Sequence, residues 1–232
     1  MSPLLDGGRQ RGVEFLDDPA VAPEVITRSM RDVARANTLF GGKRAALAEL
    51  RPAIEGLRET GSLLDVGTGL GDIPAAAKRL AGTLRLSLWT IGMDCSPPLI
   101  AIERRALDAV VRADALCLPF ADRSVDIVMA SQVLHHFPNE SAVSLIREMN
   151  RVARTRVVIA DLRRSRIAAV GLWLGSFPLG FHPVSRHDGV VSVMRGFQPV
   201  ELTEIVEVAT GRRPVVQRRL GFRLTTSWNP DP

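Results

Sequence analysis

Three aspartates in this 232-residue chain follow short apolar runs, and glycines surround the first of them. Asp65 lies in the run 63–66, Asp94 comes one β-turn-α-β unit later, and Asp114 follows a third run. The glycines after Asp65 are Gly67, Gly69 and Gly71. Glycines let a backbone turn sharply and approach a ligand closely, because they have no Cβ. The pattern predicts a ligand site with carboxylates at the ends of successive strands.

The charge of this loop indicates which kind of ligand it would hold. A carboxylate at Asp65 repels a nearby pyrophosphate but attracts an ammonium or sulfonium group. The third glycine of a GxGxxG dinucleotide fingerprint would fall at position 72, which is Asp72. The ligand should therefore be positively charged near the loop. Asp94 is placed to accept hydrogen bonds from ribose hydroxyls, and Asp114 from an adenine amino group. Any one of these acids alone is equally well explained as a turn residue.

The four histidines lie in two segments where a pocket is expected. His135 and His136 follow the fourth apolar run, while His182 and His187 lie in a long segment after the fifth. Histidine is the side chain whose pKa best suits a general base near neutral pH. We expect His135 to be the base, with the other three as weaker candidates, and His136 to point away from it if the turn is extended. A packing role for one of the pair stays open.

Short apolar runs alternate with amphipathic segments from residue 62 onward, which predicts βαβ units and a parallel sheet. The expected strands are 63–66, 84–93, 109–111, 125–130 and 156–160, followed by a terminal hairpin of runs 215–220 and 222–226 split at Gly221. Expected helices include 25–40, 45–57 with a break or kink at Pro52, and 199–210. Three more helices begin near Asp72, Ser96 and Asn139, which can cap them.

Four segments together resemble the class I S-adenosylmethionine-dependent methyltransferases of the small-molecule, type 11 (UbiE-like) group. They are LDVGTGLGD, the acid in IGMDCSP, the run ADALCLPFADRSVDIVMASQVLHHF and the later EMNRVAR. The resemblance implies a Rossmann-like α/β fold, with a seven-stranded, mostly parallel sheet, an antiparallel last hairpin and helices on both faces. It also implies one structural domain in two parts: a helical N-terminal lid segment over 1–58, and an S-adenosylmethionine-binding domain over 59–232 with a cap insertion at 165–197.

The resemblance also assigns roles to residues around the cofactor S-adenosylmethionine. It implies that the methionine part is surrounded by Asp65, Gly67, Thr68, Gly69 and Gly71. Asp94 would take the ribose, Cys95 would lie against one face of adenine, Asp114 and Ala115 would meet its edge, and Ser131 would border the sulfonium. The sequence departs from the family in lacking a Pro-Gly-Gly turn before its fifth strand, which shortens a turn far from these residues.

The cap insertion at 165–197 is the expected acceptor site, because it combines apolar bulk with a few polar groups. Its candidate substrate-binding residues are Trp173, Phe177, His182, His187 and Arg195. The apolar content favours an aromatic or lipid-like acceptor over a nucleotide or a protein. A surface cap that merely covers the sheet is an equally weighted interpretation.

The composition of the chain and one short segment argue against nucleic acids and membranes as binding partners. The 30 basic and 25 acidic residues indicate a mixed surface rather than a nucleic-acid-binding stripe, and the segment after the fourth strand reads Ala-Ser-Gln-Val where amino-methylating nucleic-acid enzymes carry a Pro-Pro tetrad. No segment predicts stable membrane insertion or a signal peptide.

Cys95 and Cys117 are expected to be buried, unreactive thiols of a cytoplasmic protein. No metal is expected, since no clustered His, Cys and Asp spacing is visible. We expect a monomer or homodimer.

The resulting hypothesis is a methyltransferase that acts on a hydroxyl of an aromatic or polyketide-like metabolite. C-methylation of a quinone-type ring is the nearer alternative. An NAD(P)-dependent oxidoreductase is a second class of enzyme, which the placement of Asp65 and Asp72 disfavours. A non-catalytic module that binds S-adenosylmethionine is a third class, which the three retained acids disfavour. We further expect the helix 25–40 to close as a lid over the occupied site.

Overall fold

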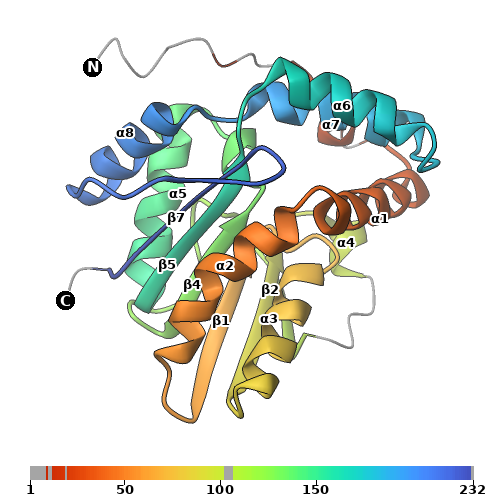
Figure 1. Ribbon diagram of the computed structural model, residues 1–232. Helices are drawn as coiled ribbons and strands as arrows, with labels where there is room; N and C mark the ends of the chain where they lie inside the picture. The colour runs from red at the N-terminus through yellow and green to blue at the C-terminus, as the bar shows by residue number, and fades with distance from the viewer. Residues whose placement is uncertain (1–8, 10–11, 19, 102–106, 231–232) are drawn as a thin grey trace.

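A seven-stranded sheet forms the centre of the computed structural model, which describes residues 9, 12–18, 20–101 and 107–230 (Figure 1). Its strand order is β3-β2-β1-β4-β5-β7-β6. The strands are β1 (Thr60–Val66), β2 (Ser87–Asp94), β3 (Ala109–Arg112), β4 (Val125–Ser131), β5 (Ala153–Leu162), β6 (Gln217–Arg219) and β7 (Arg223–Trp228). The first five are parallel, whereas β7 runs antiparallel to β5 and β6. The predicted mostly parallel sheet with an antiparallel last hairpin is confirmed.

Helices cover both faces of the sheet, as predicted. On one face lie α2 (Gly42–Glu55) and α3 (Asp72–Thr83), whose apolar residues form a core with Leu63, Ile127 and Val158. On the other face lie α5 (Asn139–Val152) and α8 (Pro199–Thr210), packed on Leu64, Val128 and Val157. Because β1, β4 and β5 are covered on both sides, their side chains are apolar in both directions.

A third group of elements lies above the carboxyl ends of the parallel strands, at the top and right of Figure 1. It consists of α1 (Pro23–Leu39), α6 (Arg166–Ser176), α7 (Pro183–Arg195), the short α4 (Pro97–Ile100) and the 3-10 turns η2 (Phe15–Asp17) and η3 (Leu134–His136). Two buried acids fasten the N-terminal elements to α7. Asp32 on α1 accepts hydrogen bonds from the backbone N of His182 (2.8 Å) and Ser185 Oγ (2.9 Å). Asp188 accepts from the backbone N of Phe15 and Leu16, each at 2.9 Å.

Several element ends differ from the sequence predictions. Asp72 and Asn139 are the first residues of α3 and α5, with Gly71 and Pro138 at the N-cap positions, so neither acts as a cap. Ser96 does occupy the N-cap of α4, without a side-chain capping bond. Pro52 lies inside α2 and does not end it. Because it stands in the last turn, its missing N–H removes only one hydrogen bond there.

Candidate active site

One cavity of about 1260 Å³ lies between the carboxyl ends of the strands and the layer of α1, α6 and α7. All the predicted cofactor residues except Gly71 line it: Asp65, Gly67, Thr68, Gly69, Asp94, Cys95, Asp114, Ala115 and Ser131. His135 and His136 line it too. The parallel topology explains this convergence, since strand ends that are far apart in sequence meet at one edge.

The glycine loop between β1 and α3 is shaped by left-handed backbone. Gly67 has φ +69°, and a Cβ there would overlap the side chain of Val133, which lines the same cavity. Gly69 has φ +53° and its backbone N donates to Asp94 Oδ2 at 3.1 Å. Gly71 has φ +73° and serves as the N-cap of α3, which places it behind the cavity wall. A side chain at Gly67 would therefore disturb the loop that follows Asp65 and that is hydrogen-bonded to Asp94 through Gly69.

Asp65 is the most perturbed carboxyl group of this loop. It is 3% exposed, and its pKa is raised to about 8, mainly by burial and further by the charges of Asp72 and Asp94. Burial also raises the pKa of Asp72, against the opposing effect of Lys43, whose Nζ lies 3.5 Å away. This end of the cavity thus collects acids with one cation. The carboxyl groups at this end of the cavity fit a positively charged group of a ligand. Such a group would stabilise the ionised form of Asp65.

The next acids along the sheet edge hold the loops that follow β2 and β3. Asp94 Oδ1 accepts from the backbone N of Ser96 at 3.0 Å, and Asp114 Oδ1 accepts from the backbone N of Leu116 at 2.9 Å. The expectation that Cys95 and Cys117 are buried is wrong, because both are exposed. Cys95 belongs to the open wall of the cavity, and burial together with the charge of Asp94 raises the pKa of its thiol. A raised pKa keeps that sulfur protonated, so it is a weak nucleophile.

His135 is held by a buried carboxylate that the sequence prediction did not include. Its Nδ1 lies 2.7 Å from Oδ1 of Asp161, at the end of β5, and both side chains are buried. Burial alone would raise the pKa of Asp161, but His135 and the backbone N of Leu162 lower it, so this carboxyl stays ionised. An ionised partner makes Nδ1 the protonated nitrogen and leaves the Nε2 lone pair free. Nε2 is buried and has no hydrogen-bond partner among the residues that the structure describes.

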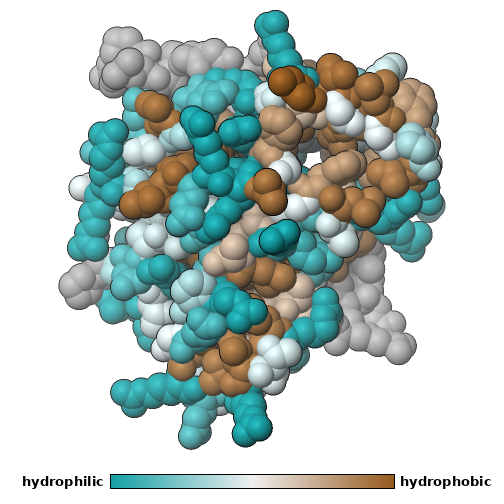
Figure 2. Space-filling model, in the orientation of Figure 1, coloured by the Kyte–Doolittle hydropathy of each residue, from teal (hydrophilic) through white to brown (hydrophobic). Residues whose placement is uncertain are grey.

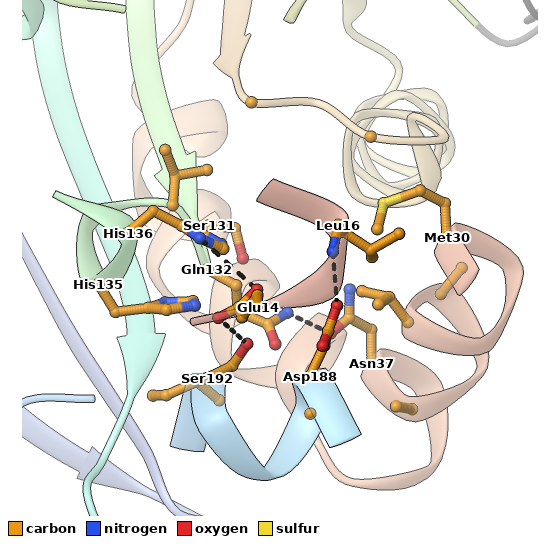
Figure 3. A pocket seen from close by; sticks show the side chains of 18 of the residues that line it. Glu14, Leu16, Met30, Asn37, Ser131, Gln132, His135, His136, Asp188 and Ser192 are labelled. Atoms are coloured by element: carbon orange, nitrogen blue, oxygen red, sulfur yellow. Dashed lines mark hydrogen bonds and ion pairs between the residues drawn. The ribbon is translucent and has the colours of Figure 1, made fainter. Parts of the chain in front are cut away.

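His136 does not point away from His135. The two rings lie 4.2 Å apart between centroids, because the segment forms the 3-10 turn η3 rather than an extended turn. Nδ1 of His136 is 3.8 Å from Oε2 of Glu14, whose Oε1 accepts from Ser192 Oγ (2.8 Å) and Arg195 (3.0 Å). Figure 3 shows Glu14, His136 and Ser192 directed toward one another. Loss of solvent contact in this partly buried position, and then the charge of His135, lower the pKa of His136. Its ring is therefore neutral near pH 7.

Glu14, His135 and His136 form a group with metal-ligand chemistry, whose ligand atoms all lie within 4.8 Å of one another. The argument that no such cluster exists is therefore wrong, because Glu14 comes from a distant part of the sequence. However, Arg195 binds Glu14 and its Nη1 lies 3.5 Å from Nδ1 of His136. A guanidinium in this position competes with a metal cation for the same groups. We interpret the cluster as an acid–base group balanced by an arginine.

The predicted substrate-binding residues lie outside the cavity lining. Trp173 and Phe177 face outward on α6 and contact each other edge to face, at 47% and 48% exposure. An apolar area over α6 is visible at the upper right of Figure 2. His182 caps α7, His187 contacts Phe15, and Arg195 holds Glu14. The insertion contributes other residues to the lining: Ile167, Ala168, Gly171, Leu172, Phe181, Ser185, Asp188, Gly189, Ser192 and Val193.

Several lining residues were missed because nothing near them in sequence marks them. Asn37 of α1 accepts a hydrogen bond from Gln132 Nε2, and Gln132 itself has φ +56°, an uncommon value for a side-chain-bearing residue (Figure 3). Arg223 reaches the cavity from β7. Asp161, the partner of His135, lies outside the cavity lining; it had a usable signal, since it directly follows the predicted strand 156–160.

Comparison with known proteins agrees with this geometry. Residues 64–160 match the family described as "Methyltransferase domain". The chain is 33% identical over 117 residues to a demethylmenaquinone methyltransferase of Roseiflexus sp. (strain RS-1), covering 46% of this chain and 44% of the relative. It is 35% identical over 97 residues to a probable tRNA methyltransferase 9B of Mus musculus, covering 41% and 20%. The chain thus spans less than half the length of these relatives.

The fold is shared with solved structures. A S-adenosylmethionine-dependent methyltransferase from Aquifex aeolicus superimposes with a TM-score of 0.58 at 17% identity, covering 91% of this chain and 100% of that one. In the part of the chain that the structure describes, no helix is long and apolar enough to cross a membrane. Residues 64–160 of this chain are thus similar to a methyltransferase domain, and the chain shares the fold of a S-adenosylmethionine-dependent methyltransferase.

Proposed function

We propose that the protein transfers a methyl group from S-adenosylmethionine to a hydroxyl of a small aromatic or polyketide-like acceptor. The observation that carries the proposal is that one cavity is lined both by the acidic glycine loop and by His135, which is paired with the buried Asp161. The first can hold a cationic cofactor, and the second can accept a proton from an acceptor. An NAD(P)-dependent oxidoreductase would instead place Asp65 and Asp72 beside a pyrophosphate, which is unfavourable.

The acids of the glycine loop would bind and orient the cofactor. S-adenosylmethionine, when bound, supplies a methyl group activated by a sulfonium. Asp65 and Asp72 provide negative charge for its cationic groups, and Asp94 provides a carboxylate for ribose hydroxyls. The tight approach of the loop depends on Gly67, at which a side chain would overlap Val133. These features support the cofactor assignment.

His135 would remove the acceptor proton. Its Nε2 is the free nitrogen, because Asp161 occupies Nδ1, and it is buried in the wall of the same cavity. A base in this position accepts the hydroxyl proton as the oxygen attacks the methyl group, while Asp161 holds the tautomer and stabilises the imidazolium. Oε2 of Glu14, whose pKa is raised by burial, lies 3.8 Å from Nδ1 of His136 and so adds an acid beside the two histidines.

The rest of the cavity is suited to an apolar acceptor. Leu16, Ile167, Leu172, Phe181 and Val193 line it, and they come from η2, α6 and α7 together with the segment between those two helices. Apolar walls with a few polar groups are typical of sites for small aromatic molecules. They also exclude water, which strengthens the electrostatic interactions of His135 and Asp161.

C-methylation of a quinone-type ring is the second candidate. It is favoured by the similarity to a demethylmenaquinone methyltransferase. The same base would serve it, since removal of a phenolic proton makes both the oxygen and the neighbouring ring carbon nucleophilic. The two candidates differ only in which acceptor atom faces the cofactor.

The test is an acceptor screen with S-adenosylmethionine that carries a deuterated methyl group. Metabolite extracts and defined phenols and quinols are incubated with the protein, and labelled products are detected by mass spectrometry. NMR of the product then distinguishes a methoxy group from a ring methyl. A calorimetric titration in which NAD(P) binds and S-adenosylhomocysteine does not would refute the proposal.

A further inference from the structure

Arg223, the first residue of β7, is a buried cation in the cavity wall. The residue is 7% exposed, it lines the cavity, and its Nε is buried without a hydrogen-bond partner. Among the described residues, no ion pair or side-chain hydrogen bond of Arg223 is found. The only other arginine of the lining is Arg112, which is exposed and whose Nε lies 3.4 Å from the carbonyl oxygen of Cys95.

Two glycines make room for the Arg223 side chain. Gly221 has φ +74°, and a Cβ there would overlap the carbonyl oxygen of Phe40, so the β6–β7 turn can lie directly on the junction of α1 and α2. At that junction, a Cβ on Gly42 would lie 3.3 Å from Nε and 3.4 Å from Nη2 of Arg223. The guanidinium of Arg223 therefore packs against the backbone of Gly42, where a larger residue would crowd it. Its strand register pairs Arg223 with Leu162, directly after Asp161 on β5.

The charge of Arg223 is not balanced by its neighbours. Burial lowers the pKa of its guanidinium to about 10, and Asp161 opposes this change only in part. The oxygens of Asp161 are already engaged by His135 and by the backbone N of Leu162. Removing a cation from water without a partner is costly, so such a group persists where a ligand provides the counter-charge. The other acids of the lining are concentrated at the glycine loop and in the η2 and α7 contacts.

We infer that Arg223 binds an anionic oxygen group of the methyl acceptor, a carboxylate or an ionised enol. The inference rests on the proposed function, because it assigns the acceptor to the part of the cavity next to His135 and Asp161. A planar guanidinium donates two parallel hydrogen bonds to such a group, which a neutral acceptor cannot match. Arg223 is thus a specificity-determining residue that selects acidic aromatic acceptors over neutral ones of the same shape.

The experiment compares benzoate with its neutral analogue benzamide as probes of the full-length protein. Each is titrated by calorimetry with the cofactor site filled by S-adenosylhomocysteine, and again without it. We expect wild type to bind benzoate about 10–100-fold more tightly than benzamide, the scale of a charge-assisted pair. Arg223→Met should abolish this preference, and Arg223→Lys should retain part of it. Arg218→Met is the matched control, since Arg218 is an exposed arginine of the adjacent strand β6.

Two results would overturn the inference. One is a wild type that binds benzamide as well as benzoate. The other is an Arg223→Met variant that loses tenfold or more in affinity for S-adenosylhomocysteine but none for 5′-methylthioadenosine, which lacks the amino acid part. That result would assign Arg223 to the carboxylate of the cofactor. Binding of S-adenosylhomocysteine to wild type tests the proposed function by itself. The titration of benzoate without S-adenosylhomocysteine tests Arg223 by itself, so a failure of the proposed function and a failure of this inference can be distinguished.

Discussion

We expect binding of the cofactor near neutral pH to release a proton from Asp65, and replacing Asp65 with asparagine to abolish this release. In the ligand-free protein the Asp65 carboxyl has a pKa of about 8, because it is buried beside Asp72 and Asp94. Below that pH it carries a proton. A cationic cofactor favours the ionised form, so binding near neutral pH should release this proton. Asparagine has the same shape and no proton to release.

The magnitude follows from the pKa. Each pH unit below about 8 should weaken binding of S-adenosylmethionine tenfold, which is ~1.4 kcal/mol per unit. At pH 6 the affinity should therefore be about 50-fold lower than at pH 8, where half of the Asp65 carboxyl groups are already ionised. The same group affects folding with a definite sign. Its folded-state pKa lies above the unfolded value of 3.8, so between pH 3.8 and about 8 the native state holds the extra proton and stability falls as pH rises.

Calorimetry between pH 5.5 and 7.0 tests this, since the amino group of the cofactor stays protonated in that range. Titrations in buffers of different ionisation enthalpy count the protons released. We expect Asp65→Asn to release one proton fewer than wild type, to bind more weakly at pH 7, and to lose less stability as pH rises. Equal proton release by the two proteins would refute the assignment of Asp65 to the cationic part of the cofactor.

Five further substitutions test other parts of the structure. Asp94→Ala should weaken binding of S-adenosylhomocysteine by about 1.5–3 kcal/mol while circular dichroism shows a retained fold. His135→Ala should lower turnover about 10²–10⁴-fold with nearly unchanged cofactor affinity, and Asp161→Asn should also lower it by releasing the tautomer; full turnover in both would exclude this base. Gly67→Ala should reduce the free energy of unfolding by about 2–5 kcal/mol in urea titrations, because it adds left-handed strain and overlap. Glu49→Gln should destabilise the protein at pH 7 and progressively less as the pH falls below 4.5, since three hydrogen bonds lower the pKa of Glu49 from 4.5 against the effect of burial.

The fold and one half of the cavity could be predicted from sequence because their signals are local. Asp65, Asp94 and Asp114 each follow an apolar run, and parallel strands bring such positions to one edge whatever their distance in the chain. The glycines after Asp65 likewise reveal a left-handed turn directly. His135 could be placed in the cavity by the same reasoning, since it follows the fourth strand.

The acceptor half could not be predicted, because it depends on contacts between distant segments. Helix α6 is apolar on all sides, so periodicity does not reveal which residues face inward; Leu172 lines the cavity, whereas its neighbour Trp173 faces outward. Glu14 reaches the histidines only because Asp188 binds the backbone of the adjacent η2 turn. Arg223 follows a hairpin turn whose docking on α1 has no sequence signature beyond Gly221.

The charges of the residues that line the cavity indicate that its two ligands carry opposite charges. The acids at the glycine loop have too few cations, and the guanidinium of Arg223 has no ion pair among the described residues. Asp161 cannot neutralise Arg223 fully, because it must remain bound to His135 to hold the base in its active tautomer. A cationic cofactor and an anionic acceptor would correct both imbalances without weakening that pair. Binding of the two ligands together should consequently stabilise the protein more than either does alone.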